Sequence, residues 1–282
     1  MQKDYILNFL NNIEIDYNKI WKESHCFALS AQDKEKTKNM SKNEAASYAA
    51  SAHVWEDGKI RAKGIKVKPD ETILEIGSGP GIISFELAAK AKHLTAIEPS
   101  LGMIEFFKDE AEKRNIKNTD TIQSFWEDYK IEKKYDVVVS SLSLITDDIF
   151  LFLKKMDEAA KRCVYIHWFA SESTWEKQGR LVSEITGQPN SVRLPKINIV
   201  FNILYGMNIF PEIRLLNSTS FNRIYDSKDE ALKALKKIYS VDTDKYDKEL
   251  LDYIERDYEY KDSKYIYYDK TKFAELMWKK DF

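Results

Sequence analysis

Short apolar runs alternate with amphipathic segments between residues 71 and 170. The apolar runs predict strands at residues 71–76, 94–98, 134–143 and 163–169, and TDTIQ at residues 119–123 predicts a further short strand. The segments between them predict helices, at residues 81–91, 102–115 and 148–162. Because the strands are almost continuously apolar, both faces of the sheet should be covered by helices. We therefore predict an α/β fold with a doubly wound, mostly parallel core sheet within residues 71–170.

The residues before this sheet predict an N-terminal helical cap or lid over residues 1–63. Apolar residues recur at helical spacing over residues 5–22, and a second helix is predicted over residues 43–63. Residues 31–44 lie between them and are nearly devoid of apolar side chains. This segment is interpreted as a solvated loop or exposed helical turn, with a mobile lid as the alternative.

The residues after the sheet have a different pattern. Residues 171–210 predict a helical insertion rich in aromatic side chains, and residues 211–282 predict the final strands and helices. Strands are expected at residues 212–225 and 264–270. Ser227 and Glu230 have the spacing of a helix capping box. Since no repeat and no linker rich in proline or glycine interrupts the chain, residues 64–282 are expected to form one domain.

Composition narrows the classes of function. The 282 residues include 44 basic and 46 acidic side chains, and this balance argues against DNA or long RNA as a partner. Cys26 and Cys163 are the two cysteines, which we interpret as reduced thiols of a cytoplasmic protein. The longest apolar stretch, residues 197–210, is too short to cross a bilayer, so no membrane association is expected.

The sequence LEIGSGPG places Gly77, Gly79 and Gly81 directly after the first predicted strand. Ligands bind at this edge of open α/β sheets, and glycines allow the backbone to approach them closely. The spacing does not match a dinucleotide fingerprint, because the third glycine comes one residue early and Ile82 occupies its place. A phosphate-binding P-loop is excluded, since no Lys-Ser or Lys-Thr follows. Glu98 ends the second strand, where a carboxylate can accept both hydroxyls of a ribose.

These features resemble the class I S-adenosylmethionine-dependent methyltransferases of the small-molecule type, whose first motif reads acid-x-Gly-x-Gly-x-Gly. The resemblance covers roughly residues 45–170. It implies a Rossmann-like, seven-stranded sheet with an antiparallel last strand, S-adenosylmethionine as the cofactor and S-adenosylhomocysteine as the product. It also implies a set of cofactor-binding residues, which are Glu75, Gly77, Ser78, Gly79, Gly81, Glu98, Pro99, Ser100, Met103, Phe125, Trp126 and Ser140.

In that assignment each part of the cofactor has its own residues. The methionine portion lies over Gly77–Gly81 near Glu75, and Glu98 takes the ribose. Pro99, Ser100 and Met103 surround the adenine, Phe125 and Trp126 close over its other face, and Ser140 and Ser141 border the methyl group. Structural roles remain as alternatives: helix caps for the two acids, packing for Met103, Trp126 and Ser140.

The sequence gives fewer signals for the residues that act on the methyl acceptor than for those that bind the cofactor. Methyl transfer is a direct displacement at a sulfonium, so alignment supplies much of the rate and a general base helps some acceptors. His167, at the end of the fifth strand, and Asp147, after the fourth, are the catalytic candidates, with Asp148 beside Asp147. The alternatives are a buried core histidine and a helix N-cap.

An acceptor pocket is expected between the N-terminal cap and residues 170–215, where aromatic residues are dense. It would suit a planar, apolar or cationic acceptor, although core packing explains the aromatics equally well. The pocket candidates are Tyr48, Trp55, Ser141, Trp168, Trp175 and Tyr205, with Phe210 nearby. His25, Cys26 and His53 match no standard ligand spacing, so no metal is expected.

The fourth strand ends in SSLSL, where enzymes that methylate base amines carry an Asn/Asp-Pro-Pro-aromatic loop. Cys163 starts the fifth strand at the opposite edge, which argues against a cysteine nucleophile. The sequence therefore predicts a methyltransferase for a small-molecule oxygen, nitrogen or sulfur atom, as a monomer or homodimer. A protein or structured RNA acceptor is the first alternative, and a non-catalytic S-adenosylmethionine-binding protein is the second.

Overall fold

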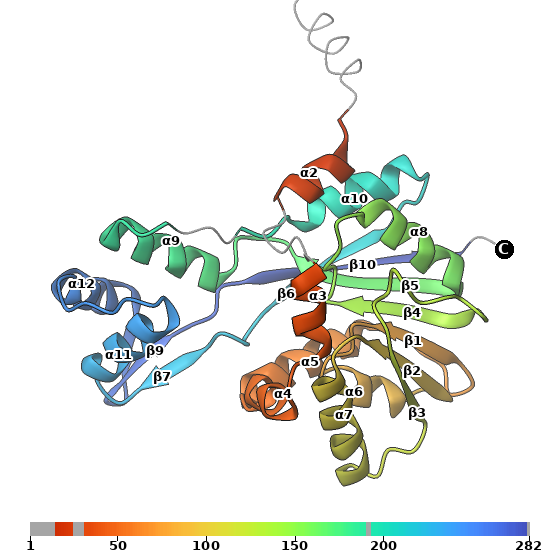
Figure 1. Ribbon diagram of the computed structural model, residues 1–282, viewed down its shortest axis with the longest axis horizontal. Helices are drawn as coiled ribbons and strands as arrows, with labels where there is room; N and C mark the ends of the chain where they lie inside the picture. The colour runs from red at the N-terminus through yellow and green to blue at the C-terminus, as the bar shows by residue number, and fades with distance from the viewer. Residues whose placement is uncertain (1–14, 25–30, 190–192, 281–282) are drawn as a thin grey trace, which may run out of the picture.

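The computed structural model describes residues 15–24, 31–189 and 193–280. Its central sheet has seven strands in the order β3-β2-β1-β4-β5-β10-β6 (Figure 1). Strands β1 to β5 are parallel, and β10 runs antiparallel to both β5 and β6. The predicted mostly parallel sheet with an antiparallel last strand is confirmed. The strands are β1 (Thr72–Ile76), β2 (His93–Glu98), β3 (Thr119–Gln123), β4 (Tyr135–Ser141), β5 (Ala160–Phe169), β6 (Glu212–Asn217) and β10 (Lys272–Lys279).

Helices cover both faces of this sheet, and each face has its own apolar core. Val138 on β4 belongs to the core under α2 (Tyr17–Ser24), α8 (Ile149–Ala159) and α10 (Ile197–Gly206). Its neighbours Val137 and Val139 point the other way, into the core with α5 (Ala52–Gly64), α6 (Ser84–Ala88) and α7 (Leu101–Lys113). Burial on both faces explains why the strands read as continuous apolar runs.

The N-terminal part contains more helix than predicted. Residues 31–44, expected as a loop or exposed helical turn, contain α3 (Ala31–Lys38) and the start of α4 (Lys42–Ala49). The helix predicted over residues 43–63 is divided into α4 and α5, because Ser51 takes an extended conformation between them. Ser41 and Glu44 form a capping box that starts α4. Part of the helix predicted over residues 5–22 lies outside the described residues, and the described part is α2.

An accessory lobe lies beside the central sheet (Figure 1). It combines α9 (Thr174–Thr186), α11 (Lys228–Ile238), α12 (Asp247–Asp257) and a small sheet of β7 (Arg223–Tyr225), β9 (Lys264–Tyr267) and β8 (Glu259–Lys261) around a third apolar core. The prediction of one strand over residues 212–225 is wrong. The chain turns after β6, with Ser220 N donating to Ser218 Oγ and Asn222 N to the Thr219 carbonyl, so β7 joins the other sheet. Ser227 caps α11 by accepting a hydrogen bond from Glu230 N, but the predicted capping box is incomplete, because the Glu230 carboxylate accepts from Asp226 N instead of Ser227 N.

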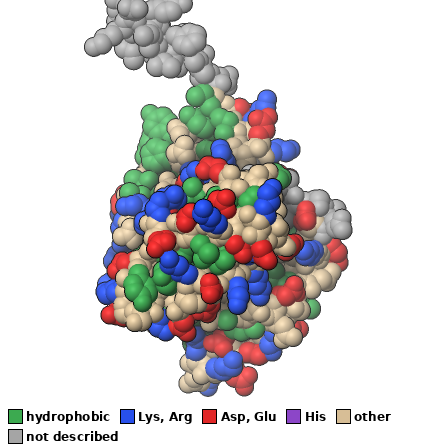
Figure 2. Space-filling model, turned by 90° about the vertical axis from the view of Figure 1, so that its left-hand side faces the viewer, with side chains coloured by type: hydrophobic (Ala, Val, Ile, Leu, Met, Phe, Trp, Pro, Cys, Tyr) green, Lys and Arg blue, Asp and Glu red, His purple; other side chains and the backbone are tan. Residues whose placement is uncertain are grey.

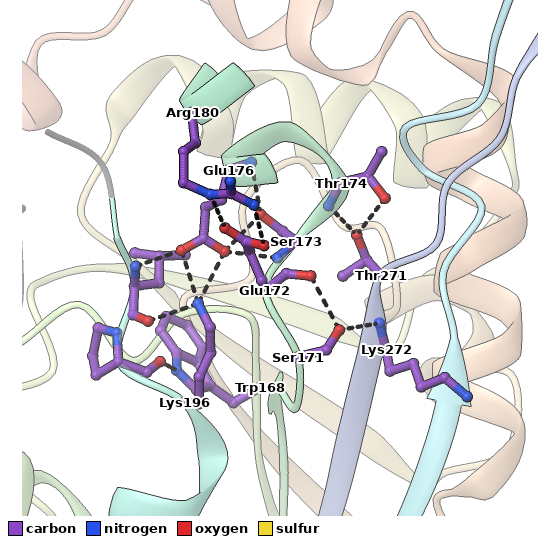
Figure 3. A network of polar contacts seen from close by, with 12 residues as sticks. Trp168, Ser171, Glu172, Ser173, Thr174, Glu176, Arg180, Lys196, Thr271 and Lys272 are labelled. Carbon is purple, nitrogen blue, oxygen red and sulfur yellow. Dashed lines mark hydrogen bonds and ion pairs between the residues drawn. The ribbon is translucent and has the colours of Figure 1, made fainter. Parts of the chain in front are cut away.

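Polar contacts fix the start of α9 to the central domain (Figure 3). The buried Glu176 carboxylate accepts hydrogen bonds from Ser173 N at 2.7 Å and Leu194 N at 2.8 Å, and it pairs with Lys196 Nζ at 2.8 Å. Beside it, Thr174 N donates to Thr271 Oγ1 at 2.8 Å, next to the start of β10. The lobe is therefore joined to the central domain through buried contacts as well as through the chain segments that connect them.

Candidate functional site

A cavity of about 240 Å³ lies at the C-terminal ends of β1, β2 and β4. This is the edge at which the sequence predicted a ligand. Its wall includes Thr37, Met40, Tyr48, Arg61, Glu75, Ile76, Gly77, Ser78, Gly79, Pro80, Ile82, Ile83, Ile97, Glu98, Pro99, Ser100, Met103, Ser124, Phe125, Trp126, Glu127, Ser141, Leu142, Ser143, Ile145 and Phe152.

The glycine turn after β1 is held in a conformation that ordinary residues rarely adopt. Gly77 has φ +68°, and a Cβ on it would lie 2.4 Å from Ser143 Cβ. Ser143 donates from Oγ to the Ile76 carbonyl at 2.6 Å and lies 2.9 Å from Ser140 Oγ. The loop after β4 therefore packs directly against the glycine turn, and only glycine at position 77 leaves room for it.

Glu98 is buried at the end of β2. Its carboxylate accepts hydrogen bonds from Gly79 N and Ser100 N, each at 2.9 Å. Burial raises the pKa of Glu98, and these two backbone hydrogen bonds oppose the rise. Each carboxylate oxygen has a further lone pair, so the side chain can still accept hydrogen bonds from a ligand in the cavity.

Glu75 is the second buried acid in the cavity wall. Its Oε2 atom has no hydrogen-bond partner. Burial raises the pKa of Glu75 to about 8, and the nearby Ser84 hydroxyl and the positive charge of Arg61 counteract part of that effect. A buried acid with an unpartnered oxygen is suited to a cationic or hydrogen-donating ligand, because such a ligand would satisfy that oxygen.

Arg61, which the sequence analysis did not single out, brings a positive charge to the same cavity. It lies on α5 and is buried, with its Nε donating to Asp57 Oδ2 at 3.0 Å. Its NH1 group donates to Ser141 Oγ at the end of β4. Asp57 and Arg61 are four residues apart on a predicted helix, a spacing typical of an ion pair. That spacing was the only signal available in the sequence, and it does not reveal that the pair is buried.

Phe125 and Trp126 form part of the wall beyond β3, beside Pro99 and Met103. Trp126 is fixed by its indole N–H, which donates to the Phe152 carbonyl at 3.2 Å. The ammonium groups of Lys34 and Lys38 on α3 lie 5.3 and 5.6 Å from the centre of the Phe125 ring. These cation–π contacts connect the N-terminal helices to the cavity wall.

The N-terminal segment also contributes directly to the cavity, through Thr37, Met40 and Tyr48. It packs against α7, where Gly102 N donates to the Met40 carbonyl at 3.1 Å. A Cβ on Gly102 would lie 2.4 Å from that carbonyl oxygen, so glycine permits the contact. Tyr48 is 58% exposed, and the charged groups near its hydroxyl are Arg61, Asp57 and Glu98.

The structure brings most of the predicted cofactor residues together in this cavity. Gly81 and Ser140 lie next to it without forming its wall. Ser141 and Tyr48 are the two acceptor-pocket candidates in the wall. The loop after β4 adds Leu142, which has φ +58°, and Ile145. Strain of this kind at a non-glycine residue is common near functional sites, but no local sequence pattern predicts it.

The remaining acceptor-pocket candidates lie elsewhere among the described residues. Trp55 stacks on Phe85 in the core under α5, and the buried Trp168 donates its indole N–H to the Pro195 carbonyl at 2.8 Å. Trp175 lies on α9 in the accessory lobe. Tyr205 is exposed and packs edge-on against Phe210.

The two catalytic candidates are also outside the cavity wall. His167 is fully buried, with Nε2 3.1 Å from Glu275 Oε2 and Nδ1 unpartnered. Burial lowers the pKa of His167, although Glu275 opposes this effect. Asp147 is exposed and lines a small neighbouring pocket with Lys34 and Glu127. The N-cap of α8 is Asp148 rather than Asp147, because Asp148 Oδ1 accepts the hydrogen bond from Leu151 N.

Two further expectations concern metals and membranes. In the part of the chain that the structure describes, no three histidine, cysteine, aspartate or glutamate side chains gather to form a metal site. His25 and Cys26 lie outside that part. Cys163 is buried in the core, at the edge of the sheet opposite the cavity. None of the described helices is long and apolar enough to span a membrane.

Residues 73–162 match the family model described as a methyltransferase domain. This segment is a methyltransferase domain of the class I type. The match begins in β1 and ends in β5, so the methyltransferase domain contains the glycine turn, Glu98 and the loop after β4. The N-terminal helices, the accessory lobe and the last two strands of the central sheet lie outside the matched segment.

The curated proteins that resemble this chain include two methyltransferases whose names give different acceptors. The chain is 27% identical over 164 residues to an uncharacterized protein of Haemophilus influenzae, covering 56% of this chain and 58% of that protein. It is 26% identical over 146 residues to a probable (S)-tetrahydroprotoberberine N-methyltransferase 2 of Papaver bracteatum, covering 51% and 37%. It is 35% identical over 93 residues to a probable ribosomal RNA small subunit methyltransferase A of Methanosphaera stadtmanae, covering 32% and 34%. The chain thus spans less than two thirds of the length of each.

Among solved structures, the chain resembles a coclaurine N-methyltransferase bound to N-methylheliamine and SAH. The TM-score is 0.52 at 12% identity, over 99% of this chain and 92% of that one. A cyclopropane-fatty-acyl-phospholipid synthase-like protein of Lactobacillus casei gives a TM-score of 0.55 at 16% identity, over 81% and 91%. At this level of identity the likeness shows the fold.

Proposed function

We propose that this protein transfers the methyl group of S-adenosylmethionine to a small-molecule acceptor by direct displacement. The observation that carries the proposal is the pair of buried acids, Glu75 and Glu98, on either side of one glycine turn in one cavity. Glu98 would accept the ribose hydroxyls, and Pro99, Met103 and Phe125 would enclose the adenine. Gly77 and Gly79 would let the backbone approach the methionine portion.

The charges of the cavity favour this cofactor over a dinucleotide. A diphosphate carries negative charge, and burying it beside Glu98 would be costly unless that acid were protonated. S-adenosylmethionine carries a positive sulfonium and an ammonium group, which such acids attract. The carboxylate of the cofactor needs a cation, and Arg61 supplies one in the same wall. Glu75 and Arg61 together are suited to the ammonium and carboxylate of one amino acid.

The acceptor would lie between the loop after β4 and the N-terminal helices. Met40, Tyr48, Leu142 and Ile145 give this part of the wall an apolar and aromatic character, and Ser141 adds a hydroxyl. A small planar or amine acceptor fits such a surface. The Papaver bracteatum relative is an N-methyltransferase by name, and the coclaurine N-methyltransferase structure contains N-methylheliamine, which supports a small-molecule amine.

A general base is not required for every such acceptor. An amine that loses its proton in solution needs only alignment with the methyl carbon and the leaving sulfur. His167 and Asp147 remain proposals for this role. His167 would have to act through a change in structure, since it is fully buried outside the cavity wall.

Structured RNA is the second candidate acceptor, because the Methanosphaera stadtmanae relative is named for ribosomal RNA. The cavity offers little to a phosphate backbone, since its wall contains one arginine and three glutamates. The basic side chains Lys63, Lys66, Lys68 and Lys90 gather with Arg162 around a different pocket, at the opposite edge of the sheet. That location favours the small-molecule acceptor.

Calorimetric titration with S-adenosylmethionine, S-adenosylhomocysteine and NAD tests the cofactor. We expect both adenosyl compounds to bind and NAD not to bind. Glu98→Ala should lose binding, whereas Glu105→Ala, at an exposed position on α7, should bind like the wild type. Binding of NAD alone, or of none of the three, would contradict the proposal. Transfer of a labelled methyl group to a small-molecule fraction or to ribosomal RNA then separates the two acceptor classes.

A further inference from the structure

The strand β6 forms one edge of the central sheet and pairs, among the described residues, with β10 alone. Five of its six residues are exposed. An exposed edge strand offers unpaired backbone N–H and carbonyl groups to another strand. The protein therefore presents a row of hydrogen-bonding groups that a second strand could satisfy.

Apolar side chains accompany this free edge. Ile213 is 53% exposed and Leu215 is 60% exposed, and both lie on the face of the sheet that carries α10. Tyr205 and Phe210, which precede β6, are 60% and 63% exposed and contact each other. Figure 2 shows hydrophobic side chains gathered in the upper part of this view, at the height of α2 and α10 in Figure 1. Exposed apolar groups that cluster in this way are typical of interaction sites.

The other face of β6 carries a positive charge in a fixed position. Arg214 lies opposite Glu275 of β10 and donates to it from Nε at 3.1 Å and from NH2 at 3.0 Å. Although burial alone would raise it, the pKa of Glu275 is lowered by its bonds with His167 and Arg214. Gly64 permits this arrangement, since a Cβ there would overlap the Arg214 guanidinium. Arg214 is therefore held in place while half of its side chain stays exposed.

We propose that a second copy of this chain covers this edge, by antiparallel pairing of β6 with its counterpart about a two-fold axis at Ile213. In that register Ile213 faces its own copy, and Glu212 faces Arg214 of the other copy. Moving the axis by one residue sets Arg214 against Arg214, or Glu212 against Glu212, and like charges directly opposite are unfavourable. Charge complementarity thus favours the axis at Ile213, because only this register pairs Glu212 with Arg214, and the apolar residues of both copies meet on one face.

Sedimentation or light scattering of the full chain tests the assembly. We expect a mass of about twice 33.0 kDa at micromolar concentrations. Ile213→Lys places two like charges opposite each other and should raise the dimer dissociation constant about tenfold or more. The matched control is Ile224→Lys, on β7 and 57% exposed, which should stay dimeric. A monomeric wild type, or a dimer that Ile213→Lys leaves unchanged, would overturn the proposal.

Cysteine cross-linking tests the register. Facing residues in an antiparallel pair have Cβ atoms close enough for a disulfide. Ile213→Cys should form a covalent dimer under mild oxidation, whereas Leu215→Cys and Ile224→Cys should not. Cross-linking at position 215 instead of 213 would contradict the proposed axis. Circular dichroism verifies that each variant is folded, and binding of S-adenosylmethionine, measured separately, keeps this test independent of the proposed activity.

Discussion

The Glu98 carboxylate accepts a hydrogen bond from Gly79 N at 2.9 Å, so the acid that ends β2 holds the glycine turn that follows β1. The backbone adds to this link, because Gly77 N donates to the Ile97 carbonyl at 2.8 Å. The group proposed to bind the ribose is therefore also a group that shapes the methionine site. A substitution at Glu98 should therefore weaken the binding of both the ribose and the methionine portion. Substitutions at Glu75 or Arg61 should affect the methionine portion alone.

Glu75 gives the stability of the protein a defined pH dependence. Burial raises the pKa of Glu75 to about 8 from its ordinary value of 4.5, so folded Glu75 is protonated at pH values where unfolded Glu75 is ionised. The unfolded state then binds fewer protons, and the free energy of unfolding falls as the pH rises between those two values. We expect this contribution to be of the order of a few kcal/mol.

Urea denaturation without cofactor at several pH values from 5.5 to about 8.5 measures this effect. Glu75→Gln removes the titrating group, so the variant should lose much of the wild-type decline and be the more stable protein at the highest pH. Glu105→Gln is the control, because Glu105 is exposed, and it should follow the wild type. Equal slopes for wild type and Glu75→Gln would show that Glu75 is ionised in the folded protein.

Most of the fold was predictable because its signals are local. Continuous valine and isoleucine runs mark strands that are buried on both faces, and Val137, Val138 and Val139 show this directly. Glu75 and Glu98 could be assigned since each sits at a strand end that the topology brings to one edge. The prediction of a single strand over residues 212–225 failed, because the turn after β6 depends on a hydrogen bond that the Ser218 hydroxyl accepts from Ser220 N rather than on the hydrophobic pattern.

The sequence alone could not show which aromatic residues line the cavity and which pack in the core. Tyr48 and Trp55 are both near helix ends, yet only Tyr48 lines the cavity, since Ser51 breaks the helix and turns α5 away from α4. Trp168 lies near the C-terminal end of β5, where the sequence suggested a pocket residue, but its side chain packs into the core. Arg61 was missed because its partner at the site, Ser141, is 80 residues away along the chain. Contacts over such separations leave no local pattern.

Gly77→Ala should abolish cofactor binding and destabilise the fold. The substitution forces alanine into φ +68° and places its Cβ 2.4 Å from Ser143 Cβ. Strain and overlap of this kind cost about 1–3 kcal/mol each. Gly206→Ala is the matched control, because Gly206 ends α10 with no atom near the added Cβ, and the change there should be neutral or stabilising. Thermal denaturation and calorimetry test both variants, and a Gly77→Ala protein that binds normally would contradict the proposed role of the turn.

Gly102→Ala should loosen the N-terminal helices from the domain. Helix propensity alone favours alanine by about 1 kcal/mol. The added Cβ would, however, lie 2.4 Å from the Met40 carbonyl oxygen, so residues 40–41 must move. We expect faster tryptic cleavage at Lys34 and Lys38 and roughly tenfold weaker binding of S-adenosylmethionine. If cleavage and affinity match those of Gly206→Ala, the contact between Gly102 and Met40 does not hold the segment in place.

Arg61→Lys should weaken the binding of S-adenosylmethionine but not that of 5′-methylthioadenosine, which lacks the amino acid portion. Lysine keeps the charge beside Asp57 and loses the planar donor group that can hold a carboxylate by two hydrogen bonds. Losing such a charged hydrogen bond costs about 1.5–3 kcal/mol, or about tenfold to a hundredfold in affinity. Glu98→Gln is the comparison. Since both ligands contain the ribose, this variant should bind both of them more weakly. Equal losses of both ligands in Arg61→Lys would instead mean that Arg61 acts by supporting Asp57 and Ser141, and that another residue binds the cofactor carboxylate.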